Sequence, residues 1–386
     1  MTGEPNIDPK IAGPAYTKKL RGARQAQIFF PLLAGGIYVY FGLHETFALQ
    51  AKIATKYFYV QVALCWIPLW LACSVGSLLT SCYRFRIERS FQLSNSSLTK
   101  WLTAWLKGNL LVFLLSALYL EITFASYRIS PSSGWLLAAL LSSALLLGTS
   151  AITPWLLAYF YPVQPLANEV LKTKLALLAK KAGLDVAMVY EWRISERTRK
   201  ANAMVAGIGH AKRILVTDTL ISALSDEQVE ALVAHELGHY ALHHTNKRVA
   251  LRCLTFFVMF WLMDLVINIG LISFHSQDDS WTNLSRIPGI LLVWSMGYLY
   301  SAIPVVALSR QQERAADAYG WKLVGGVDHF ISAMEKLTDL NLVFFDKKSQ
   351  WQYSHPTTAS RIDAAREYAK IHFVQNITPR AAVAGE

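Results

Sequence analysis

Long apolar stretches separated by polar segments dominate the chain. Most of them approach or exceed the roughly 20 residues that a helix needs to cross the hydrocarbon core of a bilayer. They are apolar on every side, whereas helices of a soluble protein carry a polar face. We therefore predict a polytopic membrane protein with about six transmembrane helices, near residues 27–43, 57–80, 108–125, 134–161, 251–274 and 288–308.

Composition and charge agree with this prediction and set an orientation. Hydrophobic residues make up 53% of the chain, and the mean hydropathy is +0.30. Most Lys and Arg residues lie in the segments that share a side with the N-terminus, while Lys52, Lys56, Arg128 and Arg286 fall on the other side. Because positive loops stay in the cytoplasm, both termini and the segments between the fourth and fifth spans and after the sixth are expected there, at the inner membrane if the protein is bacterial.

The charge balance also bears on partners. The net charge of +11 is spread over juxtamembrane loops without a nucleic-acid motif, so we expect a lipid bilayer and no nucleic acid as partner. The four cysteines show no Cys-x-x-Cys spacing and are expected to be reduced. Glu121 and Asp264 lie within predicted spans, where each either makes a polar contact between helices or lines a hydrated cavity.

The segment after residue 225 has the pattern of a capped helix that carries a metal motif. Ser225 and Gln228 can form a capping box, and apolar residues then recur at helical spacing to about His244. Within this helix the chain reads His-Glu-Leu-Gly-His, from His235 to His239. Two imidazoles one turn apart can bind one zinc ion, and Glu236 between them can take a proton from a water. The alternative is two histidines on a helix surface.

A third protein ligand is expected from elsewhere, because a catalytic zinc has three protein ligands and one open position. The segment Ser309 to Asp317 offers Glu313 as that ligand, and Asp317 four residues later can accept a hydrogen bond from His235. The alternative for this segment is a solvated helix face with an ion pair to Arg314. Short apolar runs at 186–190, 204–208 and 214–217 predict a small sheet, whose edge could pair with an extended peptide.

These motifs resemble the integral-membrane gluzincins that include type I CAAX prenyl proteases and HtpX-type proteases. The resemblance covers His235–His239 and Glu313–Asp317, and adds Asn202-Ala203 and the segment from His355-Pro356 to Arg361, within about residues 188–366. It implies that His355 and Arg361 stabilise the oxyanion of the tetrahedral intermediate. It also implies that Asn202 and Ala203 bind the substrate backbone.

The expected protein is mainly α-helical, a membrane zinc metalloendopeptidase with one zinc ion per chain and a cytoplasmic gluzincin-like domain that contains a small β-sheet. Glu236, His355 and Arg361 would be catalytic, and the expected substrate is a membrane-associated peptide or protein. Four spans precede the metal helix, more than the two of HtpX-type enzymes and about one fewer than in prenyl proteases, so CAAX processing and quality control of misfolded membrane proteins both stay open. A non-catalytic metal-binding membrane scaffold is the other alternative.

The expected divisions of the chain are a four-helix membrane region, the first protease part, a transmembrane hairpin, the second protease part and a tail, at residues 1–161, 162–250, 251–308, 309–374 and 375–386.

Overall fold

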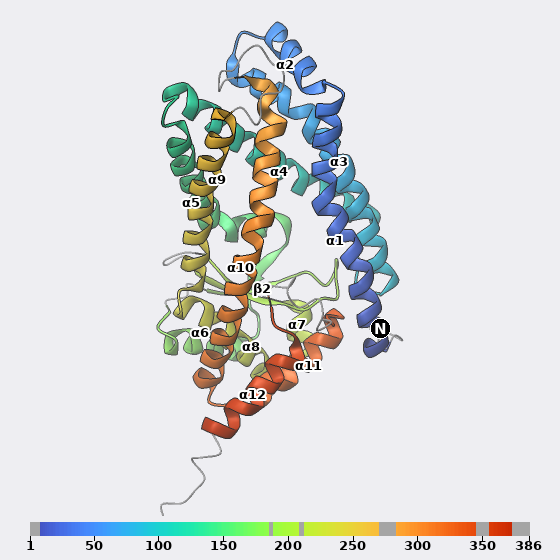
Figure 1. The fold of residues 1–386 in the computed structure, drawn as a ribbon. Helices are drawn as coiled ribbons and strands as arrows, with labels where there is room; N and C mark the ends of the chain where they lie inside the picture. Colours follow the sequence, from blue (N-terminus) through green and yellow to red (C-terminus); the bar gives the residue numbers. More distant parts are fainter. Residues whose placement is uncertain (1–7, 185–187, 208–211, 270–282, 345–354, 373–386) are drawn as a thin grey trace, which may run out of the picture.

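The computed structural model describes residues 8–184, 188–207, 212–269, 283–344 and 355–372. Long helices run along the molecule, and a small sheet with shorter helices lies at one end (Figure 1). The long helices are α1 (Pro9–Tyr40), α3 (Phe58–Ser90), α4 (Leu98–Ile129), α5 (Gly134–Phe160), α9 (His244–Asn268) and α10 (Ile287–Val324), with the shorter α2 (Leu43–Ala54) after α1.

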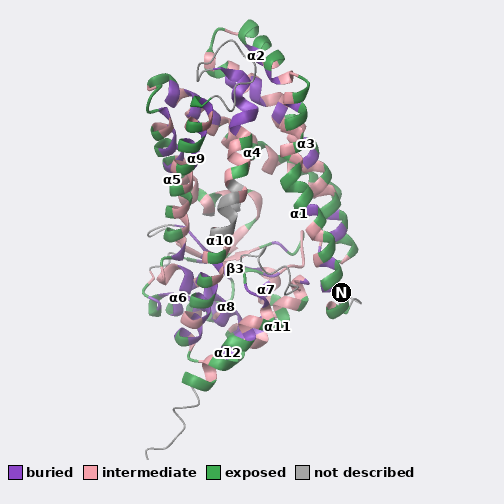
Figure 2. Cartoon of the chain, viewed as in Figure 1, coloured by how far each residue is buried: buried purple, intermediate pink, exposed green. Residues whose placement is uncertain are grey.

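The described parts of the predicted apolar stretches lie mainly on these helices, and residues 270–274 of the fifth stretch lie outside the described residues. Four described helices, α3, α4, α5 and α9, are long and apolar enough to cross a membrane, and α1 with α2 makes a fifth if this pair, bent by 73°, is one span. Their apolar windows are only 17–33% buried, and exposed residues cover their outer surfaces (Figure 2). Because a soluble protein would bury such surface, the exposed face suits lipid. The prediction of a membrane protein is confirmed, and the predicted number of six spans is approximate.

One predicted intramembrane acid makes a polar contact between helices. Asp264 on α9 accepts a hydrogen bond from the Tyr127 hydroxyl of α4 at 3.1 Å and another from Asn268 at 2.9 Å. This contact joins two spans and agrees with the first of the two alternatives for Asp264.

The sheet has four strands in the order β1-β2-β4-β3, formed by β1 (Val163–Pro165), β2 (Met188–Trp192), β3 (Ala203–Ala206) and β4 (Arg213–Thr217). Strand β2 is parallel to β4, while β1 and β3 are antiparallel to their neighbours. Strands β2 to β4 correspond to the three predicted apolar runs, of which residues 186, 187 and 208 lie outside the described residues. Strand β1 was not predicted. Strand β3 forms one edge of the sheet.

Helix α8 (Asp226–Ala241) is the buried centre of this end of the molecule. It begins with the predicted capping box, in which Ser225 and Gln228 each bond the other's backbone. Val229, Val233 and Leu237 are fully buried on it. The helix ends at Ala241 and not near His244 as expected, because His243 is left-handed with φ of 56° and His244 begins α9. Around it lie α6 (Glu169–Lys181), α7 (Asp218–Ala223), α11 (Asp328–Asn341) and α12 (Thr358–His372).

The expected domain boundaries at 250/251 and 308/309 fall inside α9 and α10. Both helices therefore continue from the membrane region into the end that carries the sheet. The division into domains stays a prediction.

Candidate metal centre and active site

Helix α8 presents two histidines to one point. His235 and His239 are one turn apart and each is 6% exposed. Their Nε2 atoms lie 3.2 Å apart, and the two rings are perpendicular. Burial of both rings on the packed side of the helix excludes the alternative of two surface histidines.

Helix α10 brings a carboxylate to the same point. Glu313 is 1% exposed, and its oxygens lie 3.4 Å from Nε2 of His235 and 3.3 Å from Nε2 of His239. A solvated face at this position, the alternative from the sequence, does not fit such burial. Two glycines permit the approach, since a Cβ on Gly238 would lie 3.0 Å from the Ala316 oxygen and one on Gly320 would lie 3.0 Å from the His235 nitrogen.

The three side chains fit a tetrahedral zinc ion. Ligand atoms about 2.0–2.1 Å from a tetrahedral ion stand about 3.3 Å from one another. The 3.2 Å between the two Nε2 atoms is close to that spacing, and so are the 3.4 and 3.3 Å from the His235 and His239 Nε2 atoms to the two oxygens of Glu313. Two imidazoles and one carboxylate are a common zinc donor set. Among the described residues, these three form the group of His, Cys, Asp and Glu that can converge on a metal.

A second layer of buried charges surrounds His235. Asp317, 2% exposed, lies with Oδ1 2.8 Å from Nδ1 of His235. Arg361 of α12 donates to both oxygens of Asp317, from Nε at 2.9 Å and from Nη2 at 2.5 Å. The same Nη2 lies 3.2 Å from Nδ1 of His235. Asp317 thereby fixes the ring orientation that points Nε2 at Glu313.

These contacts shift the pKa values of the group. Burial and Arg361 lower the pKa of His235, but the carboxylates of Asp317 and Glu313 outweigh them and raise it to about 9. Burial raises the pKa of Glu313, yet hydrogen bonds from His235, His239 and His355 bring it well below its usual range. Asp317 also has a lowered pKa, because Arg361 and His235 overcome the effect of burial. Without a metal, His235 therefore holds a proton at neutral pH.

Two further predicted residues lie on the accessible side of this centre. The Glu236 carboxylate is 4.0 Å from Nε2 of His235, with its side chain 29% exposed. Nδ1 of His355 lies 2.8 Å from a Glu313 oxygen, and its side chain is 57% exposed. Arg361 differs from them, since its side chain is 10% exposed and faces Asp317. His244 contacts His239 through their Nδ1 atoms at 3.1 Å.

Strand β3 carries Ala203 beside the metal helix, directly after Asn202. Thr217 of β4 donates its backbone N–H to the Asn202 oxygen, so Asn202 faces β4. Alternate residues of an antiparallel strand bond the same neighbour, so Ala203 and Val205 direct their backbone groups to the free edge. The Tyr240 hydroxyl of α8 accordingly bonds the Val205 oxygen at 3.1 Å. The edge predicted for an extended peptide therefore lies next to α8.

The close contact between α8 and α10, which two glycines permit, was not predicted from the sequence. Gly238 and Gly320 are both in helix interiors, where glycine costs about 1 kcal/mol relative to alanine. That unfavourable position was the available signal of a close helix contact.

Comparison with known proteins adds a decisive match. Residues 165–369, just over half of the chain, match peptidase family M48. The chain belongs to peptidase family M48. It is 26% identical over 292 residues to "Uncharacterized metalloprotease YhfN" of Bacillus subtilis, covering 73% of this chain and 68% of the relative. It is 25% identical over 334 residues to "CAAX prenyl protease 1" of Saccharomyces cerevisiae, covering 79% and 72%.

The fold agrees with a solved structure. Ste24p of S. mikatae superposes with a TM-score of 0.81 at 21% identity, over 95% of this chain and 91% of that one. As a member of M48, the chain is a metalloprotease that acts on a peptide or protein, and the family implies a bound metal. Its apolar helices make it an integral membrane protein. The predicted membrane gluzincin is thus confirmed.

Proposed function

We propose that the protein is a zinc endopeptidase whose metal is held by His235, His239 and Glu313, with Glu236 as general base. One observation carries the proposal: the Nε2 atoms of His235 and His239 lie 3.2 Å apart, each within 3.4 Å of one oxygen of the buried Glu313 carboxylate, and Glu236 lies beside them on the more accessible side. Zinc at such a centre supplies a Lewis acid for the scissile carbonyl and lowers the pKa of a water. Glu236 takes the proton of the attacking water and then gives it to the leaving amine.

The charges around the centre suit a developing oxyanion. His355 is exposed beside Glu313 and can donate a hydrogen bond to the substrate oxygen that becomes the oxyanion. Arg361 contributes positive charge from the buried side, where Asp317 holds it next to His235. The scissile peptide would lie extended along β3, with Ala203 bonding its backbone and the Asn202 side chain contacting it. Such pairing presents a peptide bond to a neighbouring centre without demanding particular side chains.

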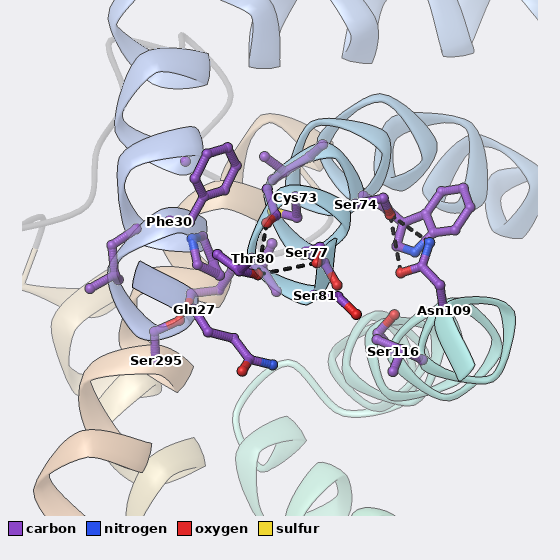
Figure 3. A pocket seen from close by; sticks show the side chains of 18 of the residues that line it. Gln27, Phe30, Cys73, Ser74, Ser77, Thr80, Ser81, Asn109, Ser116 and Ser295 are labelled. Atoms are coloured by element: carbon purple, nitrogen blue, oxygen red, sulfur yellow. Dashed lines mark hydrogen bonds between the residues drawn. The ribbon is translucent and has the colours of Figure 1, made fainter. Parts of the chain in front are cut away.

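For the substrate class we propose a peptide with an attached prenyl group. A cavity of about 940 Å³ lies between α1, α3, α4 and α10 (Figure 3). Apolar side chains such as Phe30, Leu69 and Val112 line it together with hydroxyls and the Asn109 amide. That volume is near the upper end of pockets that take small apolar ligands. Processing of unfolded membrane segments, the alternative, has no need of such a cavity.

The cavity and the peptide strand are joined by charged side chains. Arg84, which lines the cavity, donates to Glu88 at 3.2 Å, and Glu88 also accepts from Lys200 at 2.7 Å. Lys200 lies two residues before Asn202. A lipid in the cavity and a peptide on β3 could therefore belong to one substrate. The resemblance to CAAX prenyl proteases supports this assignment, and the loop charges support an active site on the cytoplasmic side.

Two comparisons test these proposals. The Glu236→Gln variant should keep the metal and lose cleavage by at least about 100-fold, which general-base catalysis commonly contributes. Unchanged peptide turnover would remove Glu236 from the mechanism. A non-catalytic scaffold would instead bind zinc and leave both casein and a quenched peptide intact.

Substrate class is tested by a farnesylated CAAX peptide and its unprenylated twin, both incubated with the purified protein in detergent. Preferential cleavage of the farnesylated peptide is expected. Equal cleavage of both peptides would favour quality control over prenyl-dependent processing.

A further inference from the structure

The three residues before β3 have every backbone polar group bonded. Lys200 donates its N–H to the Thr198 hydroxyl at 3.2 Å, and its oxygen accepts from the Thr219 hydroxyl at 2.8 Å. Asn202 donates to the Thr217 hydroxyl at 2.9 Å and accepts from the Thr217 N–H at 3.0 Å. These residues lie outside a regular helix or strand, and side chains make most of their hydrogen bonds.

The residue between them, Ala201, is held by a single side chain from far along the chain. The Asn341 carboxamide at the end of α11 accepts from the Ala201 N–H at 2.8 Å and donates to the Ala201 oxygen at 3.0 Å. One side chain thus acts as a strand would, bonding both groups of one residue. Ala201 is 4% exposed, so water cannot replace these bonds without opening the segment.

We infer that Asn341 is a positioning residue for peptide binding, which holds Ala201 and thereby fixes the register of the Ala203 edge against α8. The inference rests on the proposed pairing of substrate with β3. Ala203 directly follows the bonded residues 200–202 and directs its N–H and oxygen to the free edge. A displacement of these residues would therefore move a bound peptide relative to Glu236. A one-residue slip of a strand would turn its side chains to the opposite face.

Binding can be separated from turnover in the Glu236→Gln background, loaded with zinc. The probes are a fluorescent extended peptide and analogues that carry one N-methyl group at successive positions. One analogue should bind about 5- to 10-fold more weakly, the size of one lost hydrogen bond, because its methyl blocks the bond to the Ala203 oxygen.

The Asn341→Asp variant keeps the acceptor for the Ala201 N–H but sets an oxygen against the Ala201 carbonyl. We expect the parent peptide to bind about 5- to 10-fold more weakly, with zinc content unchanged, and the N-methyl penalty to fall below about 2-fold. A purely structural role would lower binding and leave that penalty intact. The matched control is Asn95→Asp, because Asn95 also donates to a carbonyl of the preceding loop, that of Ser195 at 2.8 Å. This control should bind both peptides as the parent enzyme does.

Unchanged peptide affinity in Asn341→Asp, an unchanged N-methyl penalty, or an equal effect of Asn95→Asp would each overturn the inference. If Asn341→Asp does not fold, Thr219→Val tests the same segment through the Lys200 carbonyl, and Thr219→Ser should restore binding. No change in Thr219→Val would then overturn it. If the unsubstituted protein neither binds zinc nor cleaves peptide, the proposed function itself fails and this inference with it. Cleavage by that protein together with unaltered binding in the variants refutes the inference alone.

Discussion

Replacing Gly320 by alanine tests whether the close contact of α8 and α10 sets the metal geometry. The new Cβ would lie 3.0 Å from the His235 nitrogen and 3.2 Å from the carbonyl carbon of Ala234. These neighbours are backbone atoms, which cannot rotate away as a flexible side chain would. The two helices must therefore separate by a few tenths of an ångström.

Two opposing effects set the change in the free energy of unfolding. Alanine in a helix interior stabilises the fold by about 0.5–1 kcal/mol relative to glycine. Overpacking costs about 1–3 kcal/mol, so the free energy of unfolding should fall by up to about 2.5 kcal/mol. Metal sites tolerate ligand displacements of only about 0.2 Å. Because His235 and Glu313 lie on opposite sides of the contact, zinc affinity should fall about 10- to 100-fold.

The assay is chelator competition for zinc in detergent, together with thermal unfolding. Gly22→Ala is the matched control, because Gly22 lies inside α1 with nothing within 4 Å of an added Cβ. This control should bind zinc normally and unfold at the same or a slightly higher temperature. Zinc affinity in Gly320→Ala equal to that of the unsubstituted protein would refute the reasoning.

Three other outcomes are expected. Glu313→Ala should contain no zinc after purification, and full metal stoichiometry would disprove its assignment as ligand. Asp317→Asn leaves the Arg361 guanidinium without its carboxylate, so the free energy of unfolding should fall by about 3 kcal/mol, whereas Asp363→Asn, whose pair with Arg366 is exposed, should have no measurable effect. Because the pKa of metal-free His235 is raised to about 9, zinc must displace its proton, and zinc affinity measured by chelator competition should rise about tenfold per pH unit from pH 6 to 8. An affinity independent of pH would contradict that proton displacement.

Local features of the sequence predicted much of this fold. Apolar length marks the spans, and the Ser225–Gln228 box marks the start of α8, because neither depends on distant residues. The first predicted span ends at residue 43, beside the left-handed Gly42 at which the chain bends, but helix α2 after it was not predicted. Strand β1 was missed because it has three residues and depends on its pairing with β2.

The residues of the candidate site also differ in how far the sequence predicts them. The pair His235 and His239 follows from helical spacing alone, whereas Glu313 required the expectation of a third ligand. Asn341 gave no signal, because its contact with Ala201 spans 140 residues and arises only when α11 packs near the sheet. Pairings of this kind are properties of tertiary packing and leave no periodic trace in the sequence.

Helix α10 connects the metal centre to the membrane cavity. It is one helix of 38 residues, about 57 Å long at 1.5 Å per residue. Pro288, Leu291 and Ser295 on it line the cavity, and Glu313 and Asp317 on the same helix reach the histidines. Gly238 and Gly320 hold α8 and α10 in close contact beside Glu313, so a tilt of α10 at the cavity would act on the metal ligands through this contact. A lipid bound in the cavity, as proposed, would therefore contact the same helix that carries Glu313 and Asp317, and a division of the chain at residue 308 would cut this helix.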